Sequence, residues 1–419
     1  MSTTIFLLLC LNHVTGFLDL PLLINNPLHG GSFLERAKSI LRRVPLVDGH
    51  NDLPWHTMQA FKGQLSGLNL KHDTRTQFPY DPTNPSQTDI PRLRQGLLGA
   101  QMWSGYTRCG NQYKDAVRWG LSMIDLIKRM VHKYHDTLQF VTTADGIMNA
   151  FRKGKIASMI GMEGGHMIDS SLAVLRMFYE LGVRYLTLTW SCDTPWADNY
   201  KDTRYNTPHN HGLSKFGEHV VGEMNRLGMM VDISHVGDDT MNDVLDVSAA
   251  PVIFSHSSVY SLCPHHRNVQ DNVLRRLKHN NGIIMINFYP VFINCTLENK
   301  HDDDNRTASV SQVADHFDYV RNLIGSDHLG VGADYDGADM VGELNDVSTY
   351  PILFAELLRR GWSEQELEKV AYRNFYRVFK DVERVRDHKR HEEPDEMLID
   401  QSEVPNQTCS TINDVWKPV

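Results

Sequence analysis

Three histidines and three carboxylates stand at the ends of short apolar runs along this 419-residue chain. A polar side chain that ends a buried strand costs free energy unless it is paired or binds something. Barrel enzymes place their active sites at the carboxyl ends of their strands, and these side chains occupy that end of their runs. The six residues are His50, Asp52, Glu163, His235, His256 and Asp334.

Spacing and residue type together predict a metal site. Residues at i and i+2 of an extended strand point the same way, so His50 and Asp52 can bind one ion together. With Glu163, His235 and His256 they make a set larger than one catalytic zinc normally uses. The surplus predicts two zinc ions that share a carboxylate, and Glu163 is the natural bridge. Any one of these side chains could be a hydrogen-bonded core residue instead, but five together favour metal binding.

The elements that must position these side chains are apolar runs separated by longer amphipathic stretches. This alternation predicts buried parallel strands joined by helices. Segments 171–182 and 213–228 have apolar residues every three or four positions and a closing glycine, as outer helices do. We expect an α/β fold, a (β/α)8 TIM-like barrel of the metal-dependent hydrolase type, over residues 33–385. Its eight runs lie at 44–50, 97–103, 156–163, 184–190, 228–235, 251–256, 282–288 and 328–334.

Composition supports one large folded unit that does not bind nucleic acid. Hydrophobic residues make up 41% of the chain and charged residues 22%, and no linker divides it. The formal net charge of -9 argues against a phosphate-binding surface. A polar insertion is expected at 58–91 near the barrel mouth, and a charged, mobile C-terminal tail at 386–419. The acidic run 302–304 lacks the spaced ligands of an EF-hand, so a solvated loop is expected there.

The two ends of the chain predict a protein secreted through the secretory pathway. Residues 1–16 contain a short apolar run followed by small residues, which we interpret as a signal peptide although no positive charge precedes the run. The last residues, CSTINDVWKPV, contain no apolar tail of the kind that a GPI anchor signal requires. Asn294, Asn305 and Asn406 head N-x-T sequons and are candidate glycosylation sites.

The cysteine count supports that compartment. Cys10 leaves with the signal peptide, and an odd number of cysteines remains, which allows two internal bridges and one bond between chains. Free buried thiols in a cytosolic enzyme are the alternative. The remaining cysteines are Cys109, Cys192, Cys263, Cys295 and Cys409.

Several longer motifs resemble those of the renal (membrane) dipeptidase family within the amidohydrolase-type barrels. The resemblance extends over about residues 44–379, and some motifs are long enough to be specific. They are VDGHNDLPW, GMEGGH, YLTLTWSCDTPWADN, SHSSVYSLC, the RNV that begins at Arg267, and GADYDG.

What the resemblance implies for the metals agrees with the residue spacing. His50 and Asp52 are implied to bind one zinc. His235 and His256 are implied to bind the other, with Glu163 as the bridge. The implied activity is zinc-dependent hydrolysis of the peptide bond of dipeptides by a metal-bridging hydroxide.

Two further roles concern the substrate. Asp334 is the candidate proton shuttle from the attacking water to the leaving amine, although it could instead orient a ligating histidine. By resemblance, Arg267 holds the terminal carboxylate of the dipeptide with a bidentate guanidinium. His265 and His266 are expected to be solvated loop residues rather than ligands.

One position departs from the family pattern in a way that affects catalysis. Trp190 stands where the resemblance places a histidine that touches the reacting substrate, so a substrate contact with reduced activity is expected. The departure leaves open a second hypothesis, a catalytically impaired metal-binding homologue with a non-enzymatic binding role. The family motif GGDFDG is GADYDG in this chain. Ala333 and Tyr335 differ from that motif, but both aspartates, Asp334 and Asp336, are in place.

Other aromatic and sulfur-containing residues give weaker expectations. Trp55 and Trp196 are expected either to line the cleft or to pack beneath its loops.

Two disulfides, Cys109 with Cys192 and Cys263 with Cys295, would each join loops near the barrel mouth, and the resemblance supports both. Cys409 is then left to link two chains, so a disulfide-linked homodimer is expected.

Overall fold

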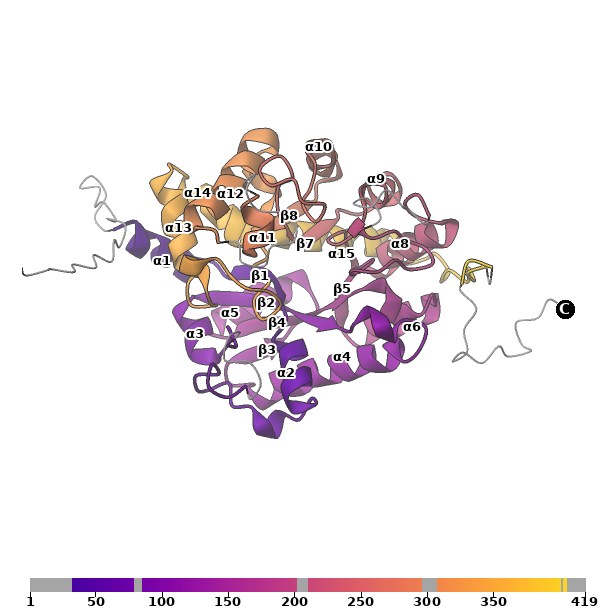
Figure 1. The fold of residues 1–419 in the computed structure, drawn as a ribbon, viewed down its shortest axis with the longest axis horizontal. Helices are drawn as coiled ribbons and strands as arrows, with labels where there is room; N and C mark the ends of the chain where they lie inside the picture. The colour runs from indigo at the N-terminus through magenta and orange to yellow at the C-terminus, as the bar shows by residue number, and fades with distance from the viewer. Residues whose placement is uncertain (1–31, 79–84, 202–209, 296–306, 401, 405–419) are drawn as a thin grey trace, which may run out of the picture.

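The structure is a computed structural model that describes residues 32–78, 85–201, 210–295, 307–400 and 402–404. Parallel strands form a closed ring with helices outside it, which confirms the predicted (β/α)8 barrel (Figure 1). The strands of the ring, each paired with the next and the last with the first, are β1 (Leu46–Asn51), β2 (Leu98–Tyr106), β4 (Ile156–Glu163), β5 (Val183–Thr187), β6 (Met230–Asp232), β7 (Ile253–Ser257), β8 (Ile283–Ile286) and β9 (Leu329–Val331).

Each predicted apolar run overlaps one strand of the ring. The residues of β1, β2 and β4 are all buried, as expected for strands covered on both faces. A further strand, β3 (Leu138–Phe140), lies outside the predicted runs and pairs with the first residues of β4. It has three residues and only its first is buried, so no apolar run marks it.

The register brings the ends of neighbouring strands to one level. Tyr106 of β2 pairs with Glu163 of β4, and Glu163 pairs with Thr187 of β5. Thr187 in turn pairs with Asp232 at the end of β6. Polar residues that are far apart in the sequence therefore meet at one edge of the barrel.

The helices predicted after the third and fourth runs are α6 (Leu172–Glu180) and α8 (Lys215–Leu227). Ser171 and Ser214 cap them by accepting backbone hydrogen bonds from their first turns. Gly228 ends α8 in the left-handed conformation, with φ of 80°. The other helices of eight or more residues are α1 (Phe33–Arg43), α2 (Leu53–Phe61), α4 (Ala116–Lys133), α5 (Ala144–Arg152), α9 (Asp238–Val247), α10 (Asp271–Asn280), α12 (Val310–Ile324), α13 (Tyr350–Arg359) and α15 (Asn374–Lys389).

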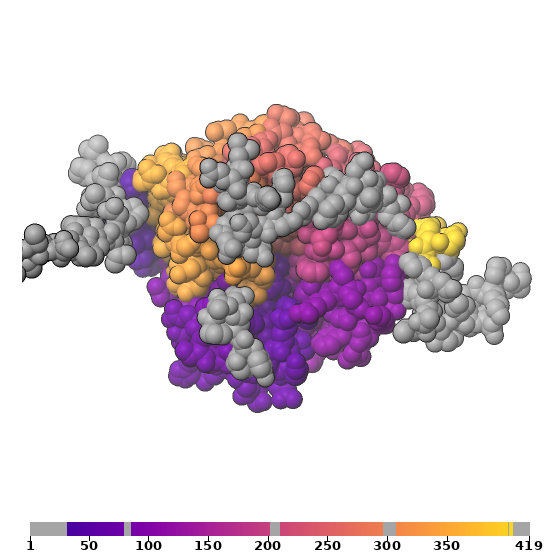
Figure 2. Space-filling view, in the orientation of Figure 1, coloured from indigo at the N-terminus to yellow at the C-terminus, as the bar shows by residue number. Residues whose placement is uncertain are grey.

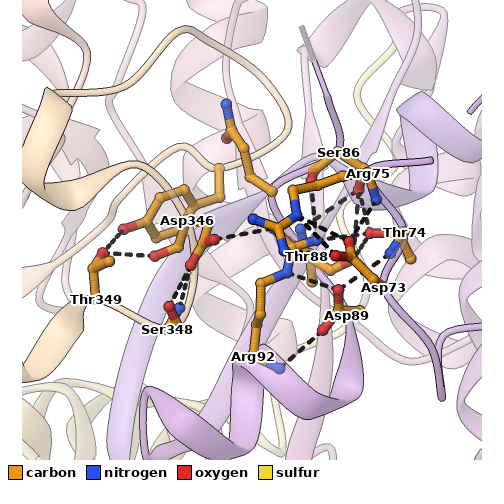
Figure 3. Close-up of polar contacts among 12 residues, drawn as sticks. Asp73, Thr74, Arg75, Ser86, Thr88, Asp89, Arg92, Asp346, Ser348 and Thr349 are labelled. Carbon is orange, nitrogen blue, oxygen red and sulfur yellow. Dashed lines mark hydrogen bonds and ion pairs between the residues drawn. The ribbon is translucent and has the colours of Figure 1, made fainter. Parts of the chain in front are cut away.

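The expected insertion packs against the segment that follows β9. Arg92, in the short helix α3 (Ile90–Gln95), joins the two parts (Figure 3). Its guanidinium lies 2.7 Å from Asp89 Oδ2 and 3.1 Å from Asp346 Oδ2, and it donates to Thr74 Oγ1. Arg92 is buried, and removing one partner of a buried ion pair typically costs about 3–5 kcal/mol. This part of the insertion is therefore firmly attached to the barrel.

The C-terminal part of the described chain also packs on the barrel. α15 extends to Lys389, so it passes the domain boundary expected at 385. Asp395 Oδ2 lies 2.5 Å from His219 Nδ1 of α8, and the Asp395 carbonyl accepts from Arg176 of α6. Asp395 and the buried Ile399 therefore attach the first part of the expected tail to the fold, although most of residues 386–400 are exposed. On the face drawn in Figure 2, the two halves of the chain pack side by side.

Both predicted intrachain disulfides are present. Cys109, just after β2, is bonded to Cys192, just after β5, and Cys263 is bonded to Cys295. Cys409, the predicted interchain cysteine, lies outside the described residues.

Other predictions fall partly outside the described chain as well. The signal peptide at 1–16, the run 302–304, and the sequons at Asn305 and Asn406 are not described. The third sequon residue, Asn294, is partly exposed, and its amide donates to Thr307 O. Among the helices of the described part, none is long and apolar enough to cross a bilayer.

Candidate metal centre and substrate pocket

The five predicted metal ligands converge at the carboxyl edge of the barrel. Glu163 Oε1 lies 2.9 Å from His235 Nε2 and 3.3 Å from His256 Nε2. Glu163 Oε2 lies 3.5 Å from His50 Nε2, and Asp52 Oδ2 lies 3.1 Å from the same nitrogen. Each oxygen of Glu163 therefore faces a different set of partners, as a bridging carboxylate requires.

The donor set fits two zinc ions. One candidate group is His50, Asp52 and Glu163, a second is Glu163, His235 and His256, and a third is His50, His256 and Asp334. Imidazole nitrogens and carboxylate oxygens are ordinary zinc ligands, and three protein ligands leave a position open for water or substrate. The buried Asp52 Oδ1 has no hydrogen-bond partner among the described residues, so it is available to an ion.

Burial and charge together favour metal-binding protonation states at Glu163, His235 and His256. Burial raises the pKa of Glu163, but His50, His235 and His256 outweigh burial and hold that pKa well below its ordinary value. Burial lowers the pKa of His235 to about 3 and that of His256 well below its ordinary value. An ionised Glu163 beside neutral His235 and His256 is a metal-binding arrangement. Burial lowers the pKa of His50, but the charges of Tyr185, Asp52 and Glu163 outweigh burial and raise that pKa well above its ordinary value, so an ion there must displace a proton.

The ring of His50 is held by a tyrosine inside the barrel. His50 Nδ1 lies 2.9 Å from the Tyr185 hydroxyl, which donates its hydrogen to Gly49 O. The hydroxyl must then accept from Nδ1–H, which leaves Nε2 free to bind a metal. Gly161 makes room for the tyrosine, because a Cβ there would lie 1.9 Å from its ring.

Two site residues have a strained backbone. His235 has φ of 67° and Asp334 has φ of 72°, both in the left-handed region. Such a conformation costs about 1–3 kcal/mol for a residue with a side chain and is concentrated at functional sites. Asp334 Oδ1 lies 3.9 Å from His50 Nε2, beside the metal ligands. Burial raises the pKa of Asp334 to about 8.

The segment around Asp334 is held in place by the insertion. Gln87 Oε1 accepts from the backbone N–H of Asp336 at 2.7 Å. The Gln87 backbone N–H donates to Asp336 Oδ1 at 2.8 Å, and its side-chain amide donates to Ala338 O at 3.0 Å. The insertion therefore fixes the loop that carries the predicted proton shuttle.

A pocket of about 550 Å³ opens beside the metal ligands. One wall is aromatic: the ring centroids of Trp55 and Tyr106 are 4.8 Å apart, as are those of Tyr106 and Trp190. Elsewhere in the lining, Arg267 packs against the ring of Phe292, with 5.3 Å from the guanidinium carbon to the ring centroid. The lining thus combines aromatic rings with two arginines, Arg267 and Arg108, and it includes the candidate ligands Asp52, Glu163, His235 and His256.

Arg267 is nearly inaccessible to bulk solvent, at 2% exposure. Its Nη1 donates to Ser257 Oγ at 3.2 Å and its Nη2 to His256 O at 3.1 Å. A guanidinium has five N–H donors, and Nε finds no partner among the described residues. Arg267 therefore has donors left for an anion, and it lines the pocket.

His265 corrects one expectation. It is 7% exposed rather than solvated, and its Nδ1 accepts the backbone N–H of Arg267 at 3.0 Å. His265 thus supports the loop that carries Arg267, and it belongs to none of the candidate metal groups in the described chain.

Comparison with known proteins assigns the family. A family model described as membrane dipeptidase (peptidase family M19) matches residues 34–393. The chain belongs to the membrane dipeptidase family. Dipeptidase 3 of Mus musculus is 48% identical, over 90% of this chain and 72% of the relative. Dipeptidase 3 of Homo sapiens is 47% identical, over 86% of this chain and 69% of the relative.

Solved structures share the membrane dipeptidase fold. A metallopeptidase from Rhodobacter sphaeroides, liganded with a phosphinate mimic of the dipeptide L-Ala-D-Ala, matches with a TM-score of 0.69 and 23% identity. The match covers 81% of this chain and 99% of that one. A probable dipeptidase from Pseudomonas aeruginosa matches with a TM-score of 0.71 and 19% identity, over 84% and 99% of the two chains.

In this membrane dipeptidase, Trp190 lies on the pocket wall as predicted. Its ring centroid is 6.2 Å from that of His235. Trp55 also lines the pocket, whereas Trp196 is fully buried and packs beneath it. Tyr335 is buried and donates to Leu344 O, so the substitution at that position does not alter the pocket lining.

Some pocket residues were not predicted. Tyr106 ends β2, so the rule that strand ends carry the site would also have identified it. Tyr200, Tyr289 and Phe292 lie outside the strands, and no local pattern distinguishes a pocket aromatic from a packed one.

Proposed function

We propose that this chain is a zinc-dependent dipeptidase with two zinc ions bridged by Glu163. The observation that carries the proposal is the composition of the pocket. Arg267, a buried arginine with an unpaired N–H donor, lines the same cavity as candidate metal ligands. A dipeptide carries a carboxylate one residue beyond its scissile carbonyl, which is the pairing of groups that such a pocket would bind.

The residues of the site then have separate tasks. His50, Asp52 and Glu163 hold one ion, and Glu163, His235 and His256 hold the other. Bound zinc supplies Lewis acidity toward a carbonyl oxygen and lowers the pKa of water toward neutrality. Arg267 binds the terminal carboxylate through its unused N–H donors.

Asp334 carries the proton. Its carboxylate lies beside His50, at the metal edge of the pocket, where it can accept a proton from water and deliver it to the leaving amine. The hydrogen bonds from Gln87 to the loop that follows Asp334 limit its motion, so the same oxygen can serve both steps.

The test is zinc content combined with a substrate panel. Purified protein is expected to hold close to two zinc ions per chain, to lose them to a strong chelator, and to cleave free dipeptides. The same dipeptide with its carboxyl group amidated should react at least about tenfold more slowly, because a charge-assisted hydrogen bond contributes about 1.5–3 kcal/mol. Absence of zinc binding, or equal cleavage of tripeptides and phosphotriesters, would contradict the proposal.

The non-enzymatic alternative is not favoured. Trp190 lines the pocket, but a volume of about 550 Å³ remains, and Arg267, Asp334 and four of the five candidate metal ligands also line it. A protein that had kept the barrel only for binding would have no need of this combined set.

Replacing Trp190 by histidine is expected to raise kcat/KM for a simple dipeptide by at least about tenfold. Histidine can donate a hydrogen bond to the oxygen that becomes negative during attack, and losing such a donor typically costs about 100-fold to 1000-fold. Indole offers one N–H on a bulkier ring with different reach. The measurement is steady-state kinetics with zinc saturating. Trp119→His on α4, outside the pocket lining, is the matched control. A slower Trp190→His enzyme would instead show that Trp190 contributes to substrate specificity as part of the pocket wall.

We also propose that the chain is secreted as a homodimer linked through Cys409, with glycans at Asn294, Asn305 and Asn406. The odd cysteine count after two internal bonds supports the link. Non-reducing electrophoresis of the mature protein is expected to show a dimer that collapses on reduction and is absent in Cys409→Ser. A monomer in every lane would exclude the covalent link.

A further inference from the structure

The second ring nitrogen of the candidate ligand His256 is held by a buried chain of side chains. His256 Nδ1 lies 2.8 Å from Ser255 Oγ, and Ser255 Oγ donates to Asp232 Oδ2 at 2.6 Å. Ser255 and Asp232 are fully buried, and His256 is 1% exposed. Water therefore does not compete for these hydrogen bonds.

The direction of the hydrogen bonds determines the tautomer of His256. A serine hydroxyl has one hydrogen, and here it goes to Asp232. Ser255 Oγ must then accept from His256 Nδ1–H, so His256 Nε2 has the lone pair. That nitrogen lies 3.3 Å from Glu163 Oε1 and 2.9 Å from His235 Nε2, at the predicted second metal position.

Asp232 is itself fixed by strands on both sides. Its Oδ2 also accepts from Thr187 Oγ1 at the end of β5, at 2.5 Å. Its Oδ1 accepts from the backbone N–H groups of Ser234 and Ser255, at 3.1 and 2.9 Å. Four donors from three consecutive barrel strands and their ends satisfy the carboxylate, so its position is set by the barrel rather than by a mobile side chain.

The partner ligand His235 is held differently. Its Nδ1 has no hydrogen-bond partner among the described residues, and its backbone is in the left-handed conformation. Of the two histidines in this group, His256 is therefore the one whose ring orientation and tautomer are set by side-chain hydrogen bonds.

We propose that Ser255 and Asp232 are positioning residues that fix the tautomer of His256 and thereby set the zinc affinity of the site formed by Glu163, His235 and His256. This inference rests on the proposed function, because it requires that zinc binds there. Outer hydrogen-bond partners of metal-ligating histidines typically contribute about 10-fold to 100-fold in metal affinity.

Two variants test the relay in different ways. Ser255→Ala removes the acceptor for Nδ1–H. Asp232→Asn keeps the shape but introduces an NH2 group, which can donate to Ser255 Oγ and turn the hydroxyl hydrogen toward His256 Nδ1. That reversal favours the tautomer with hydrogen on Nε2, which cannot bind zinc. Ser258→Ala is the matched control, since this buried hydroxyl donates to Asn287 Oδ1 and contacts no candidate ligand.

The readout is zinc affinity, measured by competition with a chromophoric chelator after metal removal. We expect wild type and Ser258→Ala to bind two zinc ions alike. One of the two sites should weaken about 10-fold to 100-fold in Ser255→Ala, and at least as much in Asp232→Asn, while the other stays unchanged. Saturating zinc should restore most of the activity of Ser255→Ala.

The outcomes separate the inference from the function on which it rests. A wild-type chain that binds no zinc would overturn the proposed function. Two wild-type sites with unchanged affinities in both variants, or equal weakening of both sites, would overturn the relay alone. Circular dichroism reports folding, and if Ser255→Ala is unfolded, the affinities of Asp232→Asn decide the question.

Discussion

Replacing Glu163 by glutamine is expected to lower kcat/KM for a dipeptide by at least about 1000-fold and to reduce zinc content from two ions per chain to fewer than one. Glutamine keeps the size of the side chain but turns one oxygen into an NH2 donor. Because the two oxygens face different ligand sets, either orientation of the amide presents a donor where an ion needs an acceptor. The measurement is steady-state kinetics beside metal analysis of the same sample.

The control for this variant removes another buried glutamate. Glu383 accepts the backbone N–H of Ala144 at the start of α5, far from the candidate ligands in sequence and in none of the metal groups of the described chain. Glu383→Gln is expected to keep both zinc ions and its activity, whatever it does to stability. Two zinc ions retained in Glu163→Gln would show that Glu163 is not the bridge.

The barrel could be predicted because strand burial leaves a direct trace in the sequence. Strands covered on both faces must be continuously apolar, and a polar residue at their carboxyl end is then conspicuous. His50, Glu163 and His256 occupy such positions in β1, β4 and β7. The candidate metal ligands were therefore predicted from the same pattern as the fold.

Features that depend on long-range contacts could not be found in this way. β3 is too short and too exposed to appear as a run, and the Gln87 contacts that hold the Asp334 loop join residues about 250 positions apart. The left-handed backbone of His235 also has no local marker, because histidine is not a residue that demands it.

The hydrogen-bonding roles of residues inside the barrel could be predicted only in part. Asp232 ends β6 and is fully buried, so the strand-end rule marks it as a residue that needs partners. Its type alone could not say whether those partners are a metal or other side chains. Only the closure of the ring shows that Thr187 and Ser255 donate to it. The position of His265 in a loop predicted a solvent-exposed side chain, but the ring is buried and accepts a hydrogen bond from the backbone N–H of Arg267.

Asp334→Asn is expected to lower kcat by about 100-fold to 10,000-fold, the usual worth of a positioned proton-transfer group, with both zinc ions retained. Asparagine is the appropriate substitution because it has the same shape and, like aspartate, tolerates the left-handed backbone found here. The amide cannot accept and release a proton near neutral pH, so the variant removes proton transfer with little change in packing.

Metal analysis distinguishes this role from direct ligation. Asp334 also lies within reach of an ion together with His50 and His256, so a carboxylate ligand is the competing interpretation. If Asp334 only moves protons, Asp334→Asn will bind zinc with wild-type affinity and will bind a phosphinate dipeptide analogue, because Arg267 and the metal ligands are intact. Asp169→Asn is the matched control, since that aspartate also has a left-handed backbone, with φ of 48°, and is not part of the pocket lining. Loss of a zinc ion in Asp334→Asn, with activity recovered by added zinc, would make Asp334 a ligand and leave the proton to be carried by another group.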